Sequence, residues 1–167
     1  MSLEFFTKRY EAQIDRSKQF TSQVGNIITW LTLLAALLGY LITESKVSGT
    51  VGLGLFWSFM LISILLSVCS ISCVFRIFFA SRLEDLAPSS QWFEHLLALE
   101  HKHGTAVSAV KEEFEKDLME HYAEAAGRNQ SVNDQVGYAL EQARFFLIGS
   151  LCFVLLSSLI FFSFYFG

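Results

Sequence analysis

The chain has 167 residues, of which 53% are apolar and 17% are charged, and its formal net charge is −4. Its apolar residues are gathered in long blocks, whereas a soluble domain of this size distributes them at periods of two or 3.6 residues. This composition excludes an ordinary soluble domain and predicts a helical membrane protein.

Residues 1–23 form a charged arm that precedes the first apolar block. A stripe at steps of three and four residues runs along it into the first block and consists of Phe6, Tyr10, Ile14, Ser17, Phe20 and Val24. This spacing predicts an amphipathic helix with its basic residues off the stripe. We expect a cytoplasmic arm that continues into the first span as one helix. The alternative is a helix lying flat on the membrane.

Three apolar blocks are long enough to cross a bilayer, and they predict transmembrane helices at residues 24–43, 53–75 and 144–166. About 20 residues with a rise of 1.5 Å each suffice for a hydrocarbon core of roughly 30 Å. In lipid the backbone polar groups must be bonded internally, which predicts helices. Residues 44–52 are expected to form the outer turn. The first block follows the charged arm and lacks a small-residue cleavage site, so we expect it to remain in the mature protein.

Residues 76–143 are predicted to form a cytoplasmic helical region between spans two and three. Pro88 marks a break in this region, and the residues after it can cap a short helix over about 91–103. Gly104 is expected to end that helix. From Ala106 onward, a repeat of three and four residues runs without proline into the third span, which predicts one helix of roughly sixty residues.

A seam with this period on a solvated helix requires partner helices, which could be the N-terminal arm or other copies of the chain. Asn129 lies on the seam, and Asn133 lies one turn later on nearly the same face. A buried amide costs stability unless it is paired across helices. We therefore predict that the two asparagines set the register or form a gate. The alternative is an exposed kink around Gly127.

The Lys and Arg residues are distributed unevenly about the spans. Eleven lie in the arm or in residues 76–144, and a single one, Lys46, lies in the turn between spans one and two. Basic residues mark the cytoplasmic side of a membrane protein. We therefore expect the N-terminus and residues 76–143 in the cytoplasm and the C-terminus outside.

Sequence patterns typical of catalysis are absent. There is no glycine-rich phosphate loop, nucleophile motif or HExxH sequence. His101 and His103 superficially resemble a metal-binding tract, but residues i and i+2 of a helix diverge by about 200°, so solvated histidines are the simpler interpretation. The three cysteines lie within the spans as small apolar side chains. We expect no enzyme activity, no catalytic residue, no cofactor and no metal site.

The region between spans two and three is acidic. Residues 82–141 carry five Lys or Arg and twelve Asp or Glu, a local charge of 5 − 12 = −7. This charge opposes nonspecific binding of nucleic acid, which depends on neutralising phosphates. A basic ring in an oligomer could still bind an anionic ligand, and the candidates are Lys111, Lys116 and Arg128. The alternative is that each is a solvated surface charge.

Span two is rich in hydroxyl groups, and Ser63, Ser67 and Ser70 form one stripe along it. The favoured interpretation is small-residue packing, with each hydroxyl bonded to the carbonyl four residues earlier. The functional interpretation is a wall of a water-filled pore. No span carries a charge before Arg76, which argues against ion-coupled transport. Three spans are too few to enclose a path, so any pore requires several copies.

The segment Tyr122–Ala126, with Asn129 and Asn133, leads into a third span behind a charged arm and a short hydrophobic hairpin. This arrangement resembles the small SLATT-type transmembrane effectors of bacterial anti-phage systems and is similar to the channel effectors of Hailong-type systems. The resemblance implies an oligomeric pore in the bacterial inner membrane that depolarises the host when a nucleotide or oligonucleotide signal changes.

The expected fold class is an all-α membrane protein with three transmembrane helices and a helical cytoplasmic extension, assembled as a symmetric homo-oligomer. The function predicted is an inner-membrane ion channel or pore acting as an effector, gated through its cytoplasmic helices. The alternative is a non-conducting membrane scaffold or regulatory subunit. Expected partners are the lipid bilayer, other copies of the chain, a nucleotide or oligonucleotide ligand and a soluble defence protein.

Overall fold

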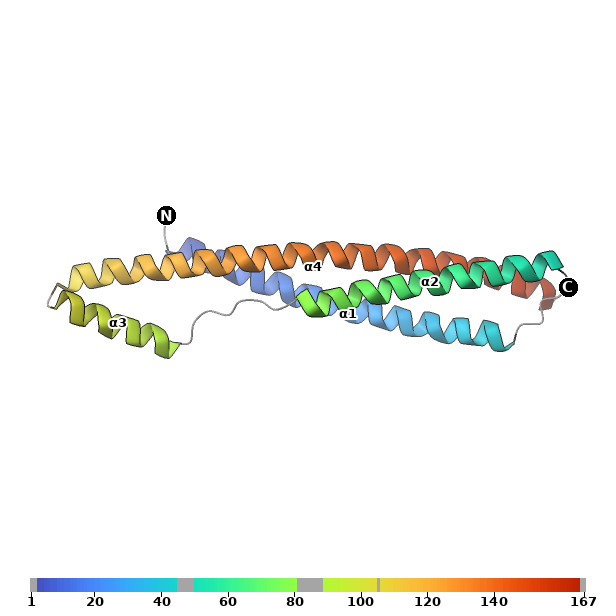
Figure 1. Ribbon diagram of the computed structural model, residues 1–167, viewed down its shortest axis with the longest axis horizontal. Coiled ribbons are helices and arrows are strands. Elements are labelled where there is room, and N and C mark those ends of the chain that lie inside the picture. The colour runs from blue at the N-terminus through green and yellow to red at the C-terminus, as the bar shows by residue number, and fades with distance from the viewer. Residues whose placement is uncertain (1–2, 45–49, 81–88, 105, 166–167) are drawn as a thin grey trace. The chain divides into compact units, whose positions relative to one another are not determined.

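The computed structural model describes residues 3–44, 50–80, 89–104 and 106–165. Every regular element in these ranges is a helix, and the four are α1 (Leu3–Thr43), α2 (Thr50–Ala80), α3 (Ser89–His103) and α4 (Val107–Tyr165) (Figure 1). The all-α fold class is therefore confirmed for the described part of the chain.

Three of these helices, α1, α2 and α4, are long and apolar enough to cross a membrane. α1 has 41 residues and α4 has 59, so the arm runs into the first span, and the helix that begins near Val107 runs into the third span. Both expectations of a single long helix are confirmed. Neither helix contains a proline that would remove a backbone donor and break it.

Gly104 ends α3, as predicted. Its φ of +56° is the left-handed conformation common just past a helix, and its N–H donates to the Glu100 carbonyl over 2.8 Å. A side chain at this position would be strained, which explains why a glycine stands there. The predicted break at Pro88, and residues 45–49 of the predicted outer turn, lie outside the described residues.

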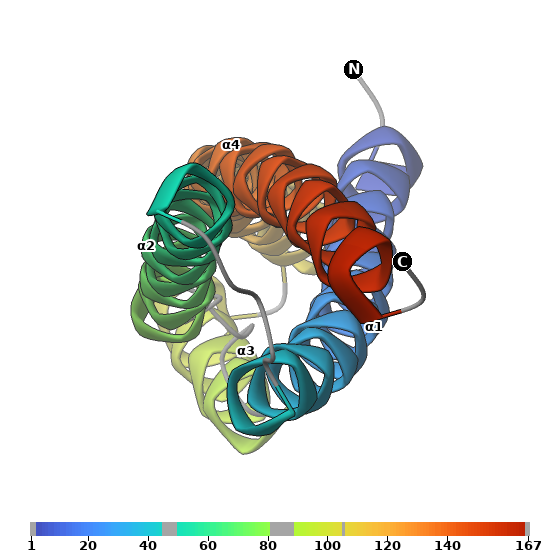
Figure 2. The same ribbon diagram turned by 90° about the vertical axis from the view of Figure 1, so that its right-hand side faces the viewer.

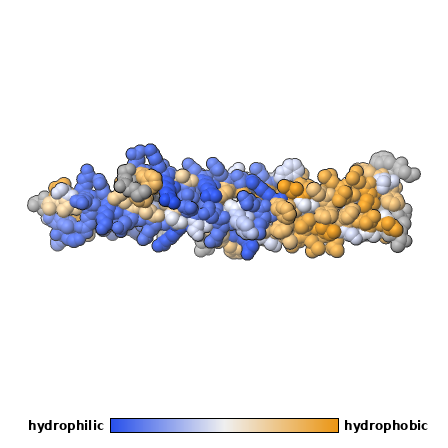
Figure 3. All heavy atoms as spheres, turned by 90° about the horizontal axis from the view of Figure 1, so that it is seen from above, coloured by the Kyte–Doolittle hydropathy of each residue, from blue (hydrophilic) through white to orange (hydrophobic). Residues whose placement is uncertain are grey.

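The contacts divide the chain into two units. One, here called the polar unit, comprises Met1–Lys18 and Ser81–Asp134, and the other, the apolar unit, comprises Gln19–Ala80 and Gln135–Gly167. Figure 3 shows hydrophobic residues gathered over the apolar unit and hydrophilic residues over the polar unit. The α1 and α4 helices each contribute residues to both units.

The core of the apolar unit joins all three of its helices, which Figure 2 shows end on. Its buried side chains come from α1, α2 and α4, and they are Leu34, Leu38, Leu41, Phe56, Met60, Val154 and Phe161. Lipid tails are as apolar as leucine, so this core is stabilised mainly by van der Waals packing. The three helices of one copy thus pack directly against one another.

In the polar unit, two helical segments lie along α4. α3 lies beside its first turns, and the start of α1 lies beside later turns (Figure 1). Arg16 Nη1 is 3.0 Å from Asp134 Oδ1, and the ring centroids of Tyr10 and Tyr122 are 5.7 Å apart. Within one chain, the N-terminal arm therefore contacts part of the α4 seam, and contacts of the seam with other copies stay a prediction.

Candidate functional site

The serines predicted from span two lie between α2 and α4. Ser63 and Ser70 are 0% exposed. Ser63 Oγ is 3.0 Å from the Ser150 carbonyl oxygen, and Ser150 Oγ is 2.8 Å from the Ser63 carbonyl oxygen. The hydroxyl of Ser70 donates to the Ala143 carbonyl over 2.8 Å. These contacts join the two helices through polar groups buried inside the apolar unit.

Only one of the three serines makes the predicted bond within its own helix. Ser67 donates to the Ser63 carbonyl over 3.0 Å, and its Oγ also lies 2.9 Å from Ser150 Oγ. For Ser63 and Ser70 that expectation is wrong, because the backbone of α4 comes close enough to accept the bonds. Helix packing therefore accounts for the stripe. Pore lining by Ser63, Ser67 and Ser70 stays a prediction that these contacts do not support.

Ser150 is the residue that the sequence analysis missed. Its hydroxyl is 0% exposed and contacts two serines of α2. The small pair Gly149-Ser150, like Ser157-Ser158 later in the same span, is a signal that could have pointed to it. A Cβ at Gly149 would lie 3.2 Å from Leu66 Cδ1, so the glycine allows the close approach of the helices.

The predicted register residues are buried in the polar unit. Asn129 is 0% exposed and Asn133 is 1% exposed. The Asn133 amide donates from Nδ2 to the Gln13 carbonyl and to Gln13 Oε1, each over 2.9 Å. The exposed-kink alternative is therefore wrong for these two side chains. Asn133 can fix the register of the arm on α4 within one copy, and a gating role for Asn129 and Asn133 stays a prediction.

The three basic ligand candidates are not brought together. Lys111, Lys116 and Arg128 all stand exposed on α4, where Lys111 and Arg128 are about 25 Å apart along the axis and point to different sides. Arg128 Nη2 lies 3.7 Å from Glu124 Oε2, and Lys111 Nζ lies 3.8 Å from Glu115 Oε1. A shared anion site made of these residues would require several copies, and it stays a prediction.

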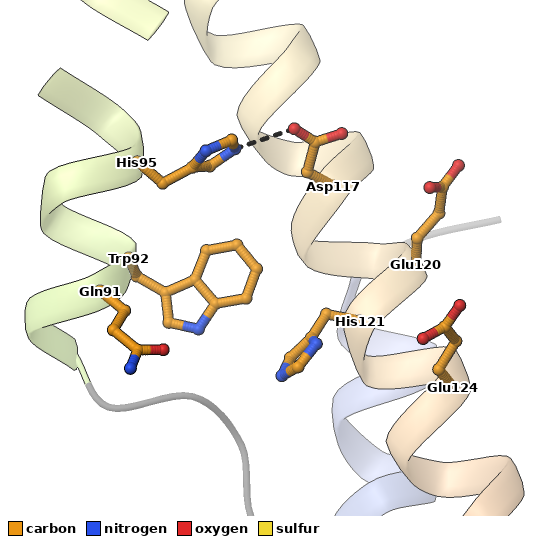
Figure 4. Close-up of a pocket in the computed structure, with 7 residues that line it drawn as sticks. All are labelled: Gln91, Trp92, His95, Asp117, Glu120, His121 and Glu124. Atoms are coloured by element: carbon orange, nitrogen blue, oxygen red, sulfur yellow. Dashed lines mark hydrogen bonds and ion pairs between the residues drawn. The ribbon is translucent and has the colours of Figure 1, made fainter. Parts of the chain in front are cut away.

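A pocket of about 420 Å³ lies between α3 and α4 in the polar unit. Trp92 forms its centre, with ring contacts to His95, His121 and Phe114 at centroid distances of 5.3 to 5.9 Å. Figure 4 shows the indole reaching from α3 toward α4, with His95 above it and His121 below. His95 Nε2 is 2.8 Å from Asp117 Oδ2, so the aromatic contact is accompanied by a polar one.

The pocket is acidic. Its carboxylates Asp117, Glu120 and Glu124 stand on successive turns of α4, and no Lys or Arg is among its described lining residues. Such a lining disfavours phosphate and suits a cationic group that can stack on an indole. Within the described ranges, no group of three His, Cys, Asp or Glu side chains could hold a metal ion.

The far end of α3 is held by Glu113. Glu113 Oε1 lies 2.7 Å from Lys102 Nζ, and Oε2 lies 2.5 Å from His103 Nε2. Both histidines were expected to be solvated. His101 is exposed as expected. His103 is half-buried instead, because the chain reverses at Gly104 and brings Glu113 of α4 against it. Hydrogen bonds from Lys102, and next from His103, hold the pKa of the Glu113 carboxyl below its ordinary value.

This lowered pKa predicts how α3 responds to pH. The stabilising contribution of Glu113 is fully present above the ordinary carboxyl pKa and is lost as pH falls through the lowered one. We expect Glu113→Gln to raise the undocked population of α3 about two- to fivefold at neutral pH. Spin-label distances between α3 and α4 would measure it.

Glu112→Gln is the matched control, since this neighbouring carboxylate is exposed and makes no ion pair with a described residue. Acidification should move the wild-type distances toward those of Glu113→Gln and change the variant less, since the contact of His95 with Asp117 is present in both. Identical distances in wild type and Glu113→Gln at neutral pH would show that the Trp92 contacts alone hold α3.

Comparisons of the chain with protein-family models, with curated proteins and with solved structures found no match. Function must therefore be inferred from the contacts and surfaces of the chain itself. The described residues offer the α2–α4 serine contacts, the arm held on α4 by Asn133, the pocket around Trp92 and the outward faces of the apolar helices.

Proposed function

We propose that the chain is a subunit of a homo-oligomeric ion channel or pore in the bacterial inner membrane. Its polar helical region would receive the signal that gates the pore. From the resemblance to SLATT-type and Hailong-type effectors, we assign this activity to anti-phage defence with a nucleotide or oligonucleotide signal. The helices of one copy pack together around a common core, so a water path would have to be enclosed by several copies.

The outward face of α1 carries this proposal. The buried residues of α1, which include Leu34 and Leu38, face α2 and α4. Roughly opposite to them on the helix is an exposed stripe of small and hydroxyl residues, formed by Gly25, Thr29, Thr32, Ala36, Gly39 and Thr43. Larger side chains such as Leu33 flank this stripe on one side. A Cβ at Gly25 or Gly39 would have no described atom within 4 Å.

The other two apolar helices present large side chains outward instead. On α2 the large exposed residues are Leu61, Leu65, Val68, Phe75 and Phe79, and the exposed Gly54, Ser58 and Ser72 share their stripe. On α4 they are Phe145, Ile148, Leu155, Leu159 and Phe162. Bulky apolar faces suit contact with lipid, whereas small residues allow two helices to approach closely in a membrane. The contrast favours α1 as the helix that meets other copies.

The stripe on α1 also suits the wall of a water path. The hydroxyls of Thr29, Thr32 and Thr43 donate to the carbonyls of Gly25, Ile28 and Gly39 over 2.9 to 3.0 Å. Each hydroxyl oxygen can still accept a bond from water. We therefore propose that α1, rather than the serine stripe of α2, lies at the centre of the oligomer.

The proposed orientation places the N-terminus and residues 76–143 in the cytoplasm and the C-terminus outside. Its support is the distribution of basic residues, with eleven on the cytoplasmic side and one, Lys46, on the other. Arg76 and Arg144 stand close to the inner ends of spans two and three under this orientation. Labelling of single cysteines from either side of the membrane would test it.

The decisive variant is Gly39→Leu. Because its Cβ meets open space, the protomer can accept leucine there, and any effect reports on contacts between copies or on the pore. We expect about a tenfold loss of ion flux in liposomes, with fewer oligomers captured by crosslinking. Gly54→Leu is the matched control, because Gly54 on α2 also meets open space. It should conduct as wild type does.

A wild-type protein that stays monomeric and carries no ion flux, with or without nucleotides, would refute the channel. Equal losses in Gly39→Leu and Gly54→Leu would refute the central position of α1.

The pocket around Trp92 favours a second candidate function. A scaffold that recruits a soluble partner to the membrane could bind a Lys or Arg of that partner between the indole and the carboxylates of Asp117, Glu120 and Glu124. Crosslinking separates the two functions. Self-crosslinks through Thr32→Cys favour the channel, and capture of a foreign chain through Glu120→Cys favours the scaffold.

A further inference from the structure

A second pocket, which belongs to the apolar unit, lies between the end of α2 and α4 and has a volume of about 510 Å³. It contains polar side chains at the level where the apolar run of α2 ends. Arg76 and Phe79 line it from α2, and Gln135, Tyr138 and Gln142 line it from α4. All of these residues belong to one unit and to described helices.

Arg76 brings a positive charge to this pocket. It follows directly on the apolar run that ends at Phe75, its side chain is exposed, and it forms no ion pair with a described residue. By contrast, Arg16 and Arg128 each lie near a carboxylate. A guanidinium at the edge of a hydrocarbon layer is stabilised by an anion that comes from outside the chain.

The neighbouring side chains add donors for the same anion. Gln142 Nε2 donates to the Tyr138 hydroxyl oxygen over 3.0 Å, which leaves the Tyr138 O–H to donate elsewhere. Gln135 is exposed and adds an amide N–H₂ group. No carboxylate is among the described lining residues. One guanidinium, one hydroxyl and one amide, with no carboxylate among the described residues around them, match the oxygens of a phosphate group.

The rim of the pocket is apolar and aromatic. Phe79 is 84% exposed and Tyr138 is 63% exposed. In water, such exposure of a phenylalanine is unfavourable, whereas acyl chains and the headgroup boundary accommodate both rings. A ligand that combines a phosphate with acyl chains would satisfy the donors and cover the aromatic rim together.

We propose that this pocket binds a phosphate oxyanion and that its source is the headgroup of an anionic phospholipid in the adjoining leaflet. Basic pockets between transmembrane helices suit such headgroups. The site is separate from the acidic pocket around Trp92, and binding to it depends neither on conduction nor on assembly. Bound lipid would tie the end of α2 to α4.

The test is lipid retention by the full-length protein, taken from mixed phosphatidylcholine and phosphatidylglycerol membranes into native mass spectrometry. We expect the wild type to retain phosphatidylglycerol selectively. Arg76→Gln should weaken its binding about tenfold and Tyr138→Phe about threefold. Arg144→Gln is the matched control, because Arg144 is another exposed arginine near the end of a span that lies outside the pocket. It should retain the lipid as wild type does.

Competition by inorganic phosphate and by soluble glycerol phosphate identifies the source of the phosphate. Displacement of phosphatidylglycerol only by other anionic lipids supports the proposal. Tight binding of a soluble phosphate that depends on Arg76 would overturn the lipid as the source. Equal losses in Arg76→Gln and Arg144→Gln would overturn the pocket itself, since a diffuse surface charge would then explain retention. Tyr138→Phe removes one hydroxyl, so it tests the site even if Arg76→Gln folds poorly.

Discussion

Ser150→Leu is expected to lower the free energy of unfolding of the apolar unit by about 2–4 kcal/mol. Ser150 is 0% exposed, and its hydroxyl lies within 2.9 Å of oxygens of Ser63 and Ser67. Leucine would force extra carbon atoms into this contact and separate α4 from α2. It would also remove the Ser150 hydroxyl, whose oxygen lies 2.7 Å from Ser63 Oγ.

The expected loss in the free energy of unfolding of Ser150→Leu combines overpacking with the loss of a hydrogen bond, and a second variant separates these two effects. Overpacking typically costs about 1–3 kcal/mol, and a hydrogen bond between membrane helices contributes about 0.6 kcal/mol. Ser150→Ala removes the hydroxyl without adding volume, so we expect it to cost only about 1 kcal/mol. Reversible unfolding in mixed micelles, followed by circular dichroism, measures both variants.

Ser72→Leu is the control for this prediction. The Ser72 hydroxyl is exposed and donates to the Val68 carbonyl of its own helix over 2.8 Å, so leucine there meets lipid or detergent. We expect a change of no more than about 0.5 kcal/mol. If Ser72→Leu and Ser150→Leu destabilised the protein equally, the α2–α4 contact would not be the feature that holds the unit together.

The helices themselves could be predicted from the sequence because lipid leaves the backbone little choice. Long apolar blocks without proline predict α1 and α4 as continuous helices, and both are. The end of α3 was also predictable, since Gly104 has a backbone conformation that other residues rarely adopt. These predictions depend only on residues that are close together in the sequence, so a single sequence is enough to make them.

The partners of each helix face could not be predicted in the same way. Periodicity places Ser63, Ser67 and Ser70 on one face of α2, but it does not say whether water, lipid or another helix meets that face. The partner, Ser150, lies 87 residues after Ser63. It continues the steps of three and four residues through Ala143 and Phe146, but this spacing does not identify the helix that it meets. Small residues in a span therefore indicate a close contact without identifying it.

The polar unit illustrates the same limit with charged residues. The divergence of His101 and His103 was predicted correctly from helix geometry, and His101 is exposed. Glu113 becomes the partner of His103 only because the chain reverses at Gly104 and brings α4 back along α3. Likewise, the apolar repeat of α4 predicted that another helix packs against it. The repeat did not show whether that helix belongs to the same chain or to another copy.

Asn133→Asp is expected to release the N-terminal arm from α4, at a cost of about 3 kcal/mol in the stability of the polar unit. Asn133 is 1% exposed, and its Nδ2 donates to two oxygens of Gln13. Aspartate has the same shape, but it would place a buried negative charge against those oxygens. The Gln13 side chain can turn its own amide N–H₂ toward the new carboxylate, whereas the backbone carbonyl cannot.

Gln130→Glu adds the same negative charge to the same helix and provides the control. Gln130 Oε1 already accepts a bond from Arg9 Nη2 over 2.9 Å, so a carboxylate there meets a guanidinium and should hold the arm as well as wild type or better. Protease cleavage within residues 3–18 would measure release of the arm. Equal protection of Asn133→Asp and wild type would show that the exposed pair of Arg16 and Asp134, rather than the buried amide, sets the register.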